Sequence, residues 1–87
     1  MPQVRLTSFV TRSDVRLEVL EELSKGPKTP TELATFHREH VSHVCRALAE
    51  LKAQGLVEPA LRASTRRYYR VTQKGLELSN TIAHSPK

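Results

Sequence analysis

The chain has no tryptophan and only two Phe and two Tyr among its 87 residues. A hydrophobic core must therefore rest on Leu and Val, and a pocket lined by aromatic side chains is not expected within one copy of the chain. A single cysteine, Cys45, excludes an internal disulfide framework and is typical of a reducing compartment. No apolar run approaches the roughly 18 residues that span a membrane, and the N-terminal residues lack the apolar stretch of a signal peptide. We therefore expect a cytoplasmic protein.

Acidic residues are also in the minority. Fourteen Lys and Arg against nine Asp and Glu give a net charge of +5. The acidic residues cluster between 14 and 22. Four arginines follow one another with no acidic residue among them, namely Arg62, Arg66, Arg67 and Arg70. Such a basic segment favours a polyanionic partner such as double-stranded DNA, with a merely solvated charged surface as the alternative.

Signatures of catalysis and of metal binding are weak. The sequence has no glycine-rich phosphate loop, no Ser-His-Asp set that can be placed and no paired carboxylates beside a plausible pocket, so we do not expect an enzyme.

His37, His40 and His43 recur every third residue near Cys45. Zinc ligands must converge, however, and on a helix Cys45 points about 200° away from His43. We expect no metal and no cofactor within one chain, and a half-buried Cys45.

Apolar spacing predicts a helix that begins near residues 11–14. Apolar residues lie four positions apart along 15–23 and form one helical stripe. Gly26 tolerates the left-handed backbone that ends a helix, and Pro27 cannot continue one. Residues 1–12 are compatible with a strand or with a backward extension of this helix.

Two further helices follow. Thr29, Pro30 and Glu32 form a predicted capping box with proline at the first helical position, and this helix ends around His37. Its inward-facing residues are expected to be Leu33, Ala34 and either Phe36 or His37. The next helix spans about 41–54 and ends at a glycine. Its buried residues repeat at three- and four-residue intervals, and they are Val44, Leu48 and Leu51.

The hydrophobic period then changes from that of a helix to that of a strand. Strands are expected at 56–58 and 67–71, joined by a polar, basic hairpin loop at 61–66. A final helix over 72–82 is capped by its first residue, a threonine. Residues 83–87 are expected to be a flexible tail. The order of helix, helix, helix, hairpin and helix is that of a winged helix.

Three segments resemble winged helix-turn-helix regulators of the arsenic-repressor (ArsR) and multiple-antibiotic-resistance (MarR) types, especially small archaeal ones. The segments are TPTELA at 29–34, SHVCRALAELKAQGLV at 42–57 and RRYYRVTQKG at 66–75. The likeness covers roughly residues 13–80. It implies an α+β, mainly α, winged helix-turn-helix fold with a three-helix core, a β-hairpin wing and a C-terminal helix. We expect a single domain over residues 1–82.

The resemblance also implies a DNA-binding face. Ser42, His43 and Arg46 match recognition-helix residues that enter the major groove, while the wing arginines match residues that reach a minor groove or phosphates. The expected DNA-binding residues lie in the turn, the recognition helix and the wing, and they are Arg38, His40, Ser42, His43, Arg46, Arg62, Ser64, Arg66 and Arg67. Arg46 could pair with guanine O6 and N7. The alternative is a solvated arginine, or one paired to Glu50 four residues on.

Two positions depart from the family pattern. Arg38 stands where family members usually have glycine in the turn. A left-handed Arg would cost on the order of 1 kcal/mol, so a turn of different shape is expected. His40 replaces the usual Ser or Thr cap of the recognition helix and is a poor cap.

These features predict a sequence-specific transcription factor, such as a repressor, associated with the nucleoid. We expect a homodimer on a pseudo-palindromic site. Its dimer surface would use apolar residues near both ends of the chain, namely Val4, Leu6, Phe9, Leu78 and Ile82. One alternative is a protein–protein interaction module of a larger transcription or chromatin assembly. Another is a nonspecific architectural DNA binder.

Overall fold

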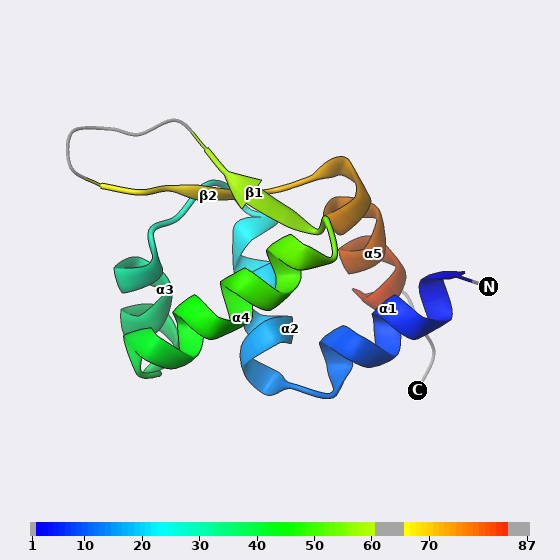
Figure 1. Ribbon diagram of the computed structural model, residues 1–87, viewed down its shortest axis with the longest axis horizontal. Helices are drawn as coiled ribbons and strands as arrows, with labels where there is room; N and C mark the ends of the chain where they lie inside the picture. The colour runs from blue at the N-terminus through cyan, green and yellow to red at the C-terminus, as the bar shows by residue number, and fades with distance from the viewer. Residues whose placement is uncertain (1, 61–65, 84–87) are drawn as a thin grey trace.

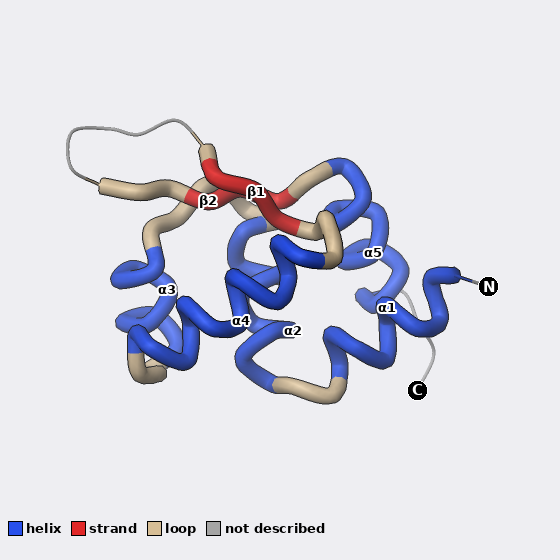
Figure 2. Tube along the Cα trace, viewed as in Figure 1, coloured by secondary structure: helices blue, strands red, loops and turns tan. Residues whose placement is uncertain are grey.

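The computed structural model describes residues 2–60 and 66–83, with side chains from residue 5 to residue 82 (Figure 1). In chain order the elements are α1 (Pro2–Thr11), α2 (Asp14–Leu23), α3 (Pro30–His37), α4 (Val41–Ala53), β1 (Val57–Pro59), β2 (Tyr69–Val71) and α5 (Gln73–Ala83). The two strands pair as an antiparallel hairpin beside a mainly helical body (Figure 2). This arrangement confirms the predicted α+β winged helix-turn-helix fold.

The N-terminal residues form a helix of their own. Ser13 lies outside both α1 and α2 with an extended backbone, and its side chain accepts a hydrogen bond from the Arg16 backbone N–H. The chain therefore turns between the two helices, and α1 is neither a strand nor a continuation of α2. It packs against α2 and α5, and Val10 at its C-terminal end is fully buried.

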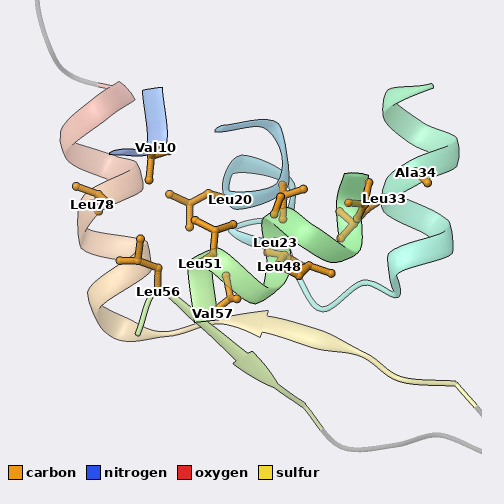
Figure 3. Close-up of a cluster of buried hydrophobic side chains, with 13 residues drawn as sticks. Val10, Leu20, Leu23, Leu33, Ala34, Leu48, Leu51, Leu56, Val57 and Leu78 are labelled. Carbon is orange, nitrogen blue, oxygen red and sulfur yellow. The ribbon is translucent and has the colours of Figure 1, made fainter. Parts of the chain in front are cut away.

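The core is built from Leu and Val, as the shortage of aromatic residues predicts. Figure 3 shows that its members come from all the helices of the described chain and from β1. The fully buried residues are Val10, Val19, Leu20, Leu23, Leu33, Val44, Leu48, Leu51, Leu56, Val57 and Leu78. Apolar area removed from water stabilises a fold by about 25 cal/mol per Å², so this cluster is what holds the helices to the hairpin.

The apolar residues expected at a dimer surface belong largely to this core. Leu78 is only 1% exposed. Leu6, Phe9 and Ile82 are half-buried and pack against the core cluster. Only the backbone is described at Val4. For the four side chains that the structure describes, the prediction of an apolar dimer surface is therefore wrong, because α1 and α5 together cover one end of the same chain's core.

Helix α3 begins at the predicted capping box. The Glu32 backbone N–H donates to Thr29 Oγ1 at 3.1 Å, and the Thr29 N–H donates to Glu32 Oε1 at 2.9 Å. Pro30 occupies the start of the helix, where its missing N–H leaves no donor unsatisfied. Both backbone donors are satisfied locally, which is why the sequence alone predicts this helix start.

The turn after α3 contradicts the prediction of an altered shape. Arg38 adopts the left-handed conformation, with φ 54° and ψ 41°. The chain can then fold back so that the Glu39 N–H reaches the Ala34 carbonyl at 2.9 Å. This closing hydrogen bond requires a left-handed residue at the helix end, and arginine occupies the conformation that glycine would adopt more easily.

Arg38→Gly is expected to raise the free energy of unfolding by about 1 kcal/mol, because it removes the contact between Cβ and the backbone in the left-handed conformation. Arg38→Ala is the matched control, since it shortens the side chain but keeps that contact. The measurement is urea unfolding, in which the midpoint should rise while the slope stays constant. Equal midpoints for the two variants would show that the turn carries no strain.

The hairpin is joined to the helix-turn-helix by a short bridge. Val57 pairs with Val71, and Pro59 at the other end of β1 pairs with Tyr69. On the other edge of β2, the Lys28 N–H donates to the Tyr69 carbonyl at 3.1 Å and the Tyr69 N–H donates to the Lys28 carbonyl at 2.8 Å. The segment that leads into α3 is therefore fixed beside β2. This pairing places the start of α3 next to the wing strand.

Candidate nucleic-acid interface

Helix α4 has one buried face and one solvent face, as its spacing predicts. Val44, Leu48 and Leu51 are at most 2% exposed and pack into the core. Ser42 and Ala49 lie on the opposite, exposed face, and the Arg46 side chain there is 82% exposed. No other element of the described residues covers this face, so α4 is free to enter a DNA major groove, which is wide enough to admit a helix.

Acidic side chains accompany the basic residues of α4. The His43 Nδ1 lies 3.2 Å from Glu39 Oε1. Arg46 Nε lies 3.7 Å from Glu50 Oε2, which is the ion pair that sequence spacing offers as the alternative to a DNA contact. Exposed ion pairs of this kind contribute about 0–1 kcal/mol, so Arg46 can exchange its partner for a base or a phosphate at little cost.

Glu50 has a stronger partner that no local pattern indicates. Arg16 of α2 donates from Nε to Glu50 Oε1 at 3.0 Å, across 34 positions of the chain. This hydrogen bond is the main cause that lowers the pKa of Glu50, with further lowering by the charges of Arg16 and Arg46. Glu50 is thus held ionised and already neutralised, which reduces its repulsion of a nearby phosphate.

A cleft of about 590 Å³ separates α4 from the wing. Its walls come from the start of α3, from one side of α4 and from the strand that returns from the wing. Side chains at its edge include Thr31, Glu32, Val41, Cys45, Arg66 and Arg67. The cleft is therefore bordered by two guanidinium groups and by α4 at once.

The electrostatics of this cleft include one carboxylate. The Thr29 backbone N–H is the main cause that lowers the pKa of Glu32, and the positive charges of Arg66 and Lys28 lower it further. Glu32 is therefore ionised as part of the capping box and in the field of Arg66. Arg67 makes no ion pair within residues 2–60 and 66–83, so its charge is available to an external anion.

The structure locates most of the expected DNA-binding residues on the surface. The exposed ones are Arg38, His40, Ser42, His43, Arg46, Arg66 and Arg67. Arg62 and Ser64 lie outside the described residues. His40 makes no side-chain hydrogen bond as the cap of α4, which confirms that it is a poor cap. Its ring instead lies edge-on to that of His43, with centroids 5.7 Å apart.

Cys45 differs from its predicted environment, whereas the two alternatives given for residues 36 and 37 are resolved. Cys45 is exposed and borders the cleft, so the expectation of a half-buried thiol is wrong. The position of Cys45 along α4 does not fix the exposure of its thiol. That exposure depends on how close the returning wing strand lies to this side of α4. Phe36 is 65% exposed, and its neighbour His37 faces inward instead.

The three histidines do not converge. His37 Nδ1 lies 2.9 Å from Glu18 Oε2 on α2, whereas His40 and His43 are exposed at the start of α4. Within residues 2–60 and 66–83, no three His, Cys, Asp or Glu side chains gather in a way that could hold a metal ion.

In the same part of the chain, no helix is long and apolar enough to cross a membrane.

Comparison with known proteins rests on solved structures, because no protein-family model and no curated protein matches the sequence. A variant of ZitR from Lactococcus lactis aligns with a TM-score of 0.75 and 20% identity, over 82% of this chain and 50% of that one. The adhesin competence repressor AdcR from Streptococcus pyogenes gives 0.76 and 19%, over 83% and 55%. The chain thus spans about half the length of these two proteins.

A third structure is similar over most of both chains. The winged helix-turn-helix DNA-binding domain of Mb0332 from Mycobacterium bovis aligns with a TM-score of 0.73 and 28% identity, over 94% of this chain and 73% of that one. That domain is described as homodimeric and as part of a possible ArsR-family transcriptional regulator. The three comparisons agree on the winged helix-turn-helix fold.

Proposed function

We infer that this winged helix-turn-helix chain is a transcriptional regulator that binds a specific sequence of double-stranded DNA. The observation that carries the proposal is that one side of α4, at Val41 and Cys45, and the wing arginines border one cleft, beside the exposed face of α4 that carries Arg46. A single duplex can therefore touch both at once, with α4 in the major groove and the wing on a minor groove or phosphates. The similarity to repressors and to a DNA-binding domain supports this function. We propose a binding protein of the cytoplasm and nucleoid, without catalytic activity.

Each part of the interface has a separate role in this proposal. Arg46 and Ser42 face bases, since they occupy the exposed side of α4. Arg66 and Arg67 contact phosphates, and Arg62 and Ser64 extend the wing contact. His43 donates to a phosphate or a base edge, while Arg38 and His40 lie at the margin of the groove. Phosphate contacts set position and base contacts set specificity.

We also propose that the chain binds DNA as a homodimer. The DNA-binding domain of Mb0332 is likewise homodimeric. A two-fold axis would place two α4 helices about 34 Å apart, one turn of DNA. Because the apolar side chains of α1 and α5 are used in the core, the contact would involve the outer surface of α5. Light scattering at micromolar concentration should give twice the mass of one chain, and a mass of one chain would contradict the dimer.

The function is tested by selecting bound sequences from a random pool of DNA duplexes. The expected product is an enriched motif with two-fold symmetric half-sites, bound in the presence of excess competitor DNA. With four to six phosphate contacts, the logarithm of affinity should fall with the logarithm of salt at a slope of roughly −4 to −5. An architectural binder would enrich no motif, and a protein-contact module would bind little DNA at physiological salt.

Arg46→Ala is expected to weaken binding to the selected site by about 1–3 kcal/mol and to reduce preference at one base pair. Arg46→Lys is the informative companion, because lysine keeps the charge but loses the planar, two-pronged donor that matches guanine. Competition binding with every base at each position measures both effects. If Arg46→Ala leaves the base preference unchanged and Arg46→Lys restores full affinity, Arg46 contacts a phosphate and does not read a base.

A further inference from the structure

A second basic surface lies on the other side of α4 from the wing. Arg5, Ser8 and Phe9 of α1 recur at three- and four-residue intervals with Arg12, whose N–H bonds to the Ser8 carbonyl directly after the helix, and so these residues share one face. Together with Arg16 of α2 they line a hollow of about 420 Å³. Both Arg5 and Arg12 are exposed. Two cationic side chains therefore face one concave surface that the DNA-binding face described above does not include.

Arg16 connects this hollow to the recognition helix. A neighbouring hollow of about 240 Å³ is lined by Arg16 together with residues of α4 that include His43, Arg46 and Glu50. Arg16 is fixed between the two hollows, since its Nη1 donates to the Phe9 carbonyl at 2.8 Å and its guanidinium lies 4.1 Å from the centre of the Phe9 ring. Arg16 is the one lining residue common to both hollows, and the surface that the two hollows cover from α1 to α4 is called here the α1 groove.

The charges of the α1 groove are incompletely balanced. Glu50 is the one acidic residue that lines either hollow, and it already receives a hydrogen bond from Arg16. Neither Arg5 nor Arg12 makes an ion pair with any residue of the described parts, 2–60 and 66–83. An anion placed in this groove would therefore meet two free guanidinium groups, which are well suited to phosphate.

The placement of the groove matches the geometry of a duplex. Cys45 borders the wing cleft and His43 borders the α1 groove, and residues two apart on a helix point about 200° from each other. Figure 1 likewise shows α1 and the wing strands on opposite sides of α4. A helix in the major groove has one phosphate strand along each flank, about 12 Å apart across the groove. With α4 in the major groove, the wing would face one strand and the α1 groove the other.

We propose that the α1 groove binds the phosphate backbone on the flank of the major groove opposite the wing, and that Arg5 and Arg12 contact these phosphates. This inference rests on the proposed DNA-binding function and extends the interface to a helix outside the helix-turn-helix. An acidic protein surface or a second copy of the chain is the competing occupant, and the experiment below separates these.

The test compares the parent with R5Q/R12Q in binding to a selected duplex across a series of NaCl concentrations. Loss of two phosphate contacts should make the salt slope shallower by about 1.8 and weaken binding roughly 10-fold or more at 0.1 M NaCl. R5K/R12K should retain the parent slope, because charge is preserved. K25Q/K74Q removes the same charge from exposed positions that line neither the α1 groove nor the wing cleft, and it should bind like the parent.

The contrary outcomes are distinct. If R5Q/R12Q keeps the parent slope while removal of Arg66 and Arg67 reduces it, the proposed function stands and the α1 groove is not a DNA contact. If the slope is unchanged and light scattering shows a lower mass for R5Q/R12Q, the groove is an interface between copies. Absence of DNA binding by the parent at any salt concentration would overturn both the inference and the proposed function. Circular dichroism of each variant verifies that it is folded.

Discussion

Gly75→Ala should lower the free energy of unfolding by about 3 kcal/mol or more, at the upper end of the cost of overpacking. Gly75 lies buried in the first turn of α5. A Cβ at this position would overlap the carbonyl oxygen of Leu56 and lie 2.7 Å from Val71 Cγ2. That carbonyl is backbone and already accepts the Thr72 N–H at 3.0 Å, so it cannot move aside without breaking this bond. Helix α5 would have to shift away from the hairpin.

The size of this effect matters because small domains have little stability to lose. At about 0.05–0.15 kcal/mol per residue, a chain of 87 residues has roughly 4–13 kcal/mol. Thermal and urea unfolding measure the loss. Gly55→Ala is the matched control, since its Cβ would have only Lys74 Nζ as a neighbour, at 3.9 Å, and only its φ of +74° opposes alanine, at about 1 kcal/mol. Similar losses for both variants would mean that α5 and β1 do not approach this closely.

Replacement of Arg66 and Arg67 by alanine should weaken DNA binding about 100-fold, or roughly 3 kcal/mol, at low salt. Both side chains are exposed at the wing cleft, where charge-assisted hydrogen bonds to phosphate would form. The salt slope should become shallower by about 2, while the preference among sequences should persist, because phosphate contacts carry no sequence information. Filter binding or fluorescence anisotropy over a salt series measures both quantities.

Arg70→Ala is the control for the wing variant. Arg70 lies on the same strand, but its Nε donates to Glu58 Oε2 at 2.7 Å, so its charge is already balanced within the hairpin. Arg70→Ala should therefore leave the salt slope of DNA binding nearly unchanged. A double variant of Arg66 and Arg67 that binds as tightly as Arg70→Ala would place the wing away from the DNA.

Elements defined by local interactions are predictable from the sequence. The capping box at Thr29 and Glu32 and the cap formed by Thr72 each join residues three positions apart, and the structure contains both. The buried stripe of α4 follows from its helical period in the same way, and so does its open face. The exposed members of the candidate DNA face, such as Ser42 and Arg46, could be predicted for this reason.

Features that join distant segments are not predictable in this way. No spacing rule pairs Arg16 with Glu50 or Lys28 with Tyr69, because these partners meet only after α2, α4 and the hairpin pack together. Arg38 adopts a strained conformation because the hydrogen bond that closes the turn requires it, and propensity alone predicts the opposite.

The sequence by itself determined the order of the elements from α2 onward, the caps of α3 and α5, the Leu and Val core and the excess of positive charge. Only the tertiary structure decided that α1 and α5 cover the core, that Cys45 borders an open cleft and that Arg5 and Arg12 line one hollow with Arg16 of α2. The reason is physical. Hydrogen bonds and side-chain stripes act over three or four residues, whereas the faces that a partner meets are set by how whole helices pack against one another.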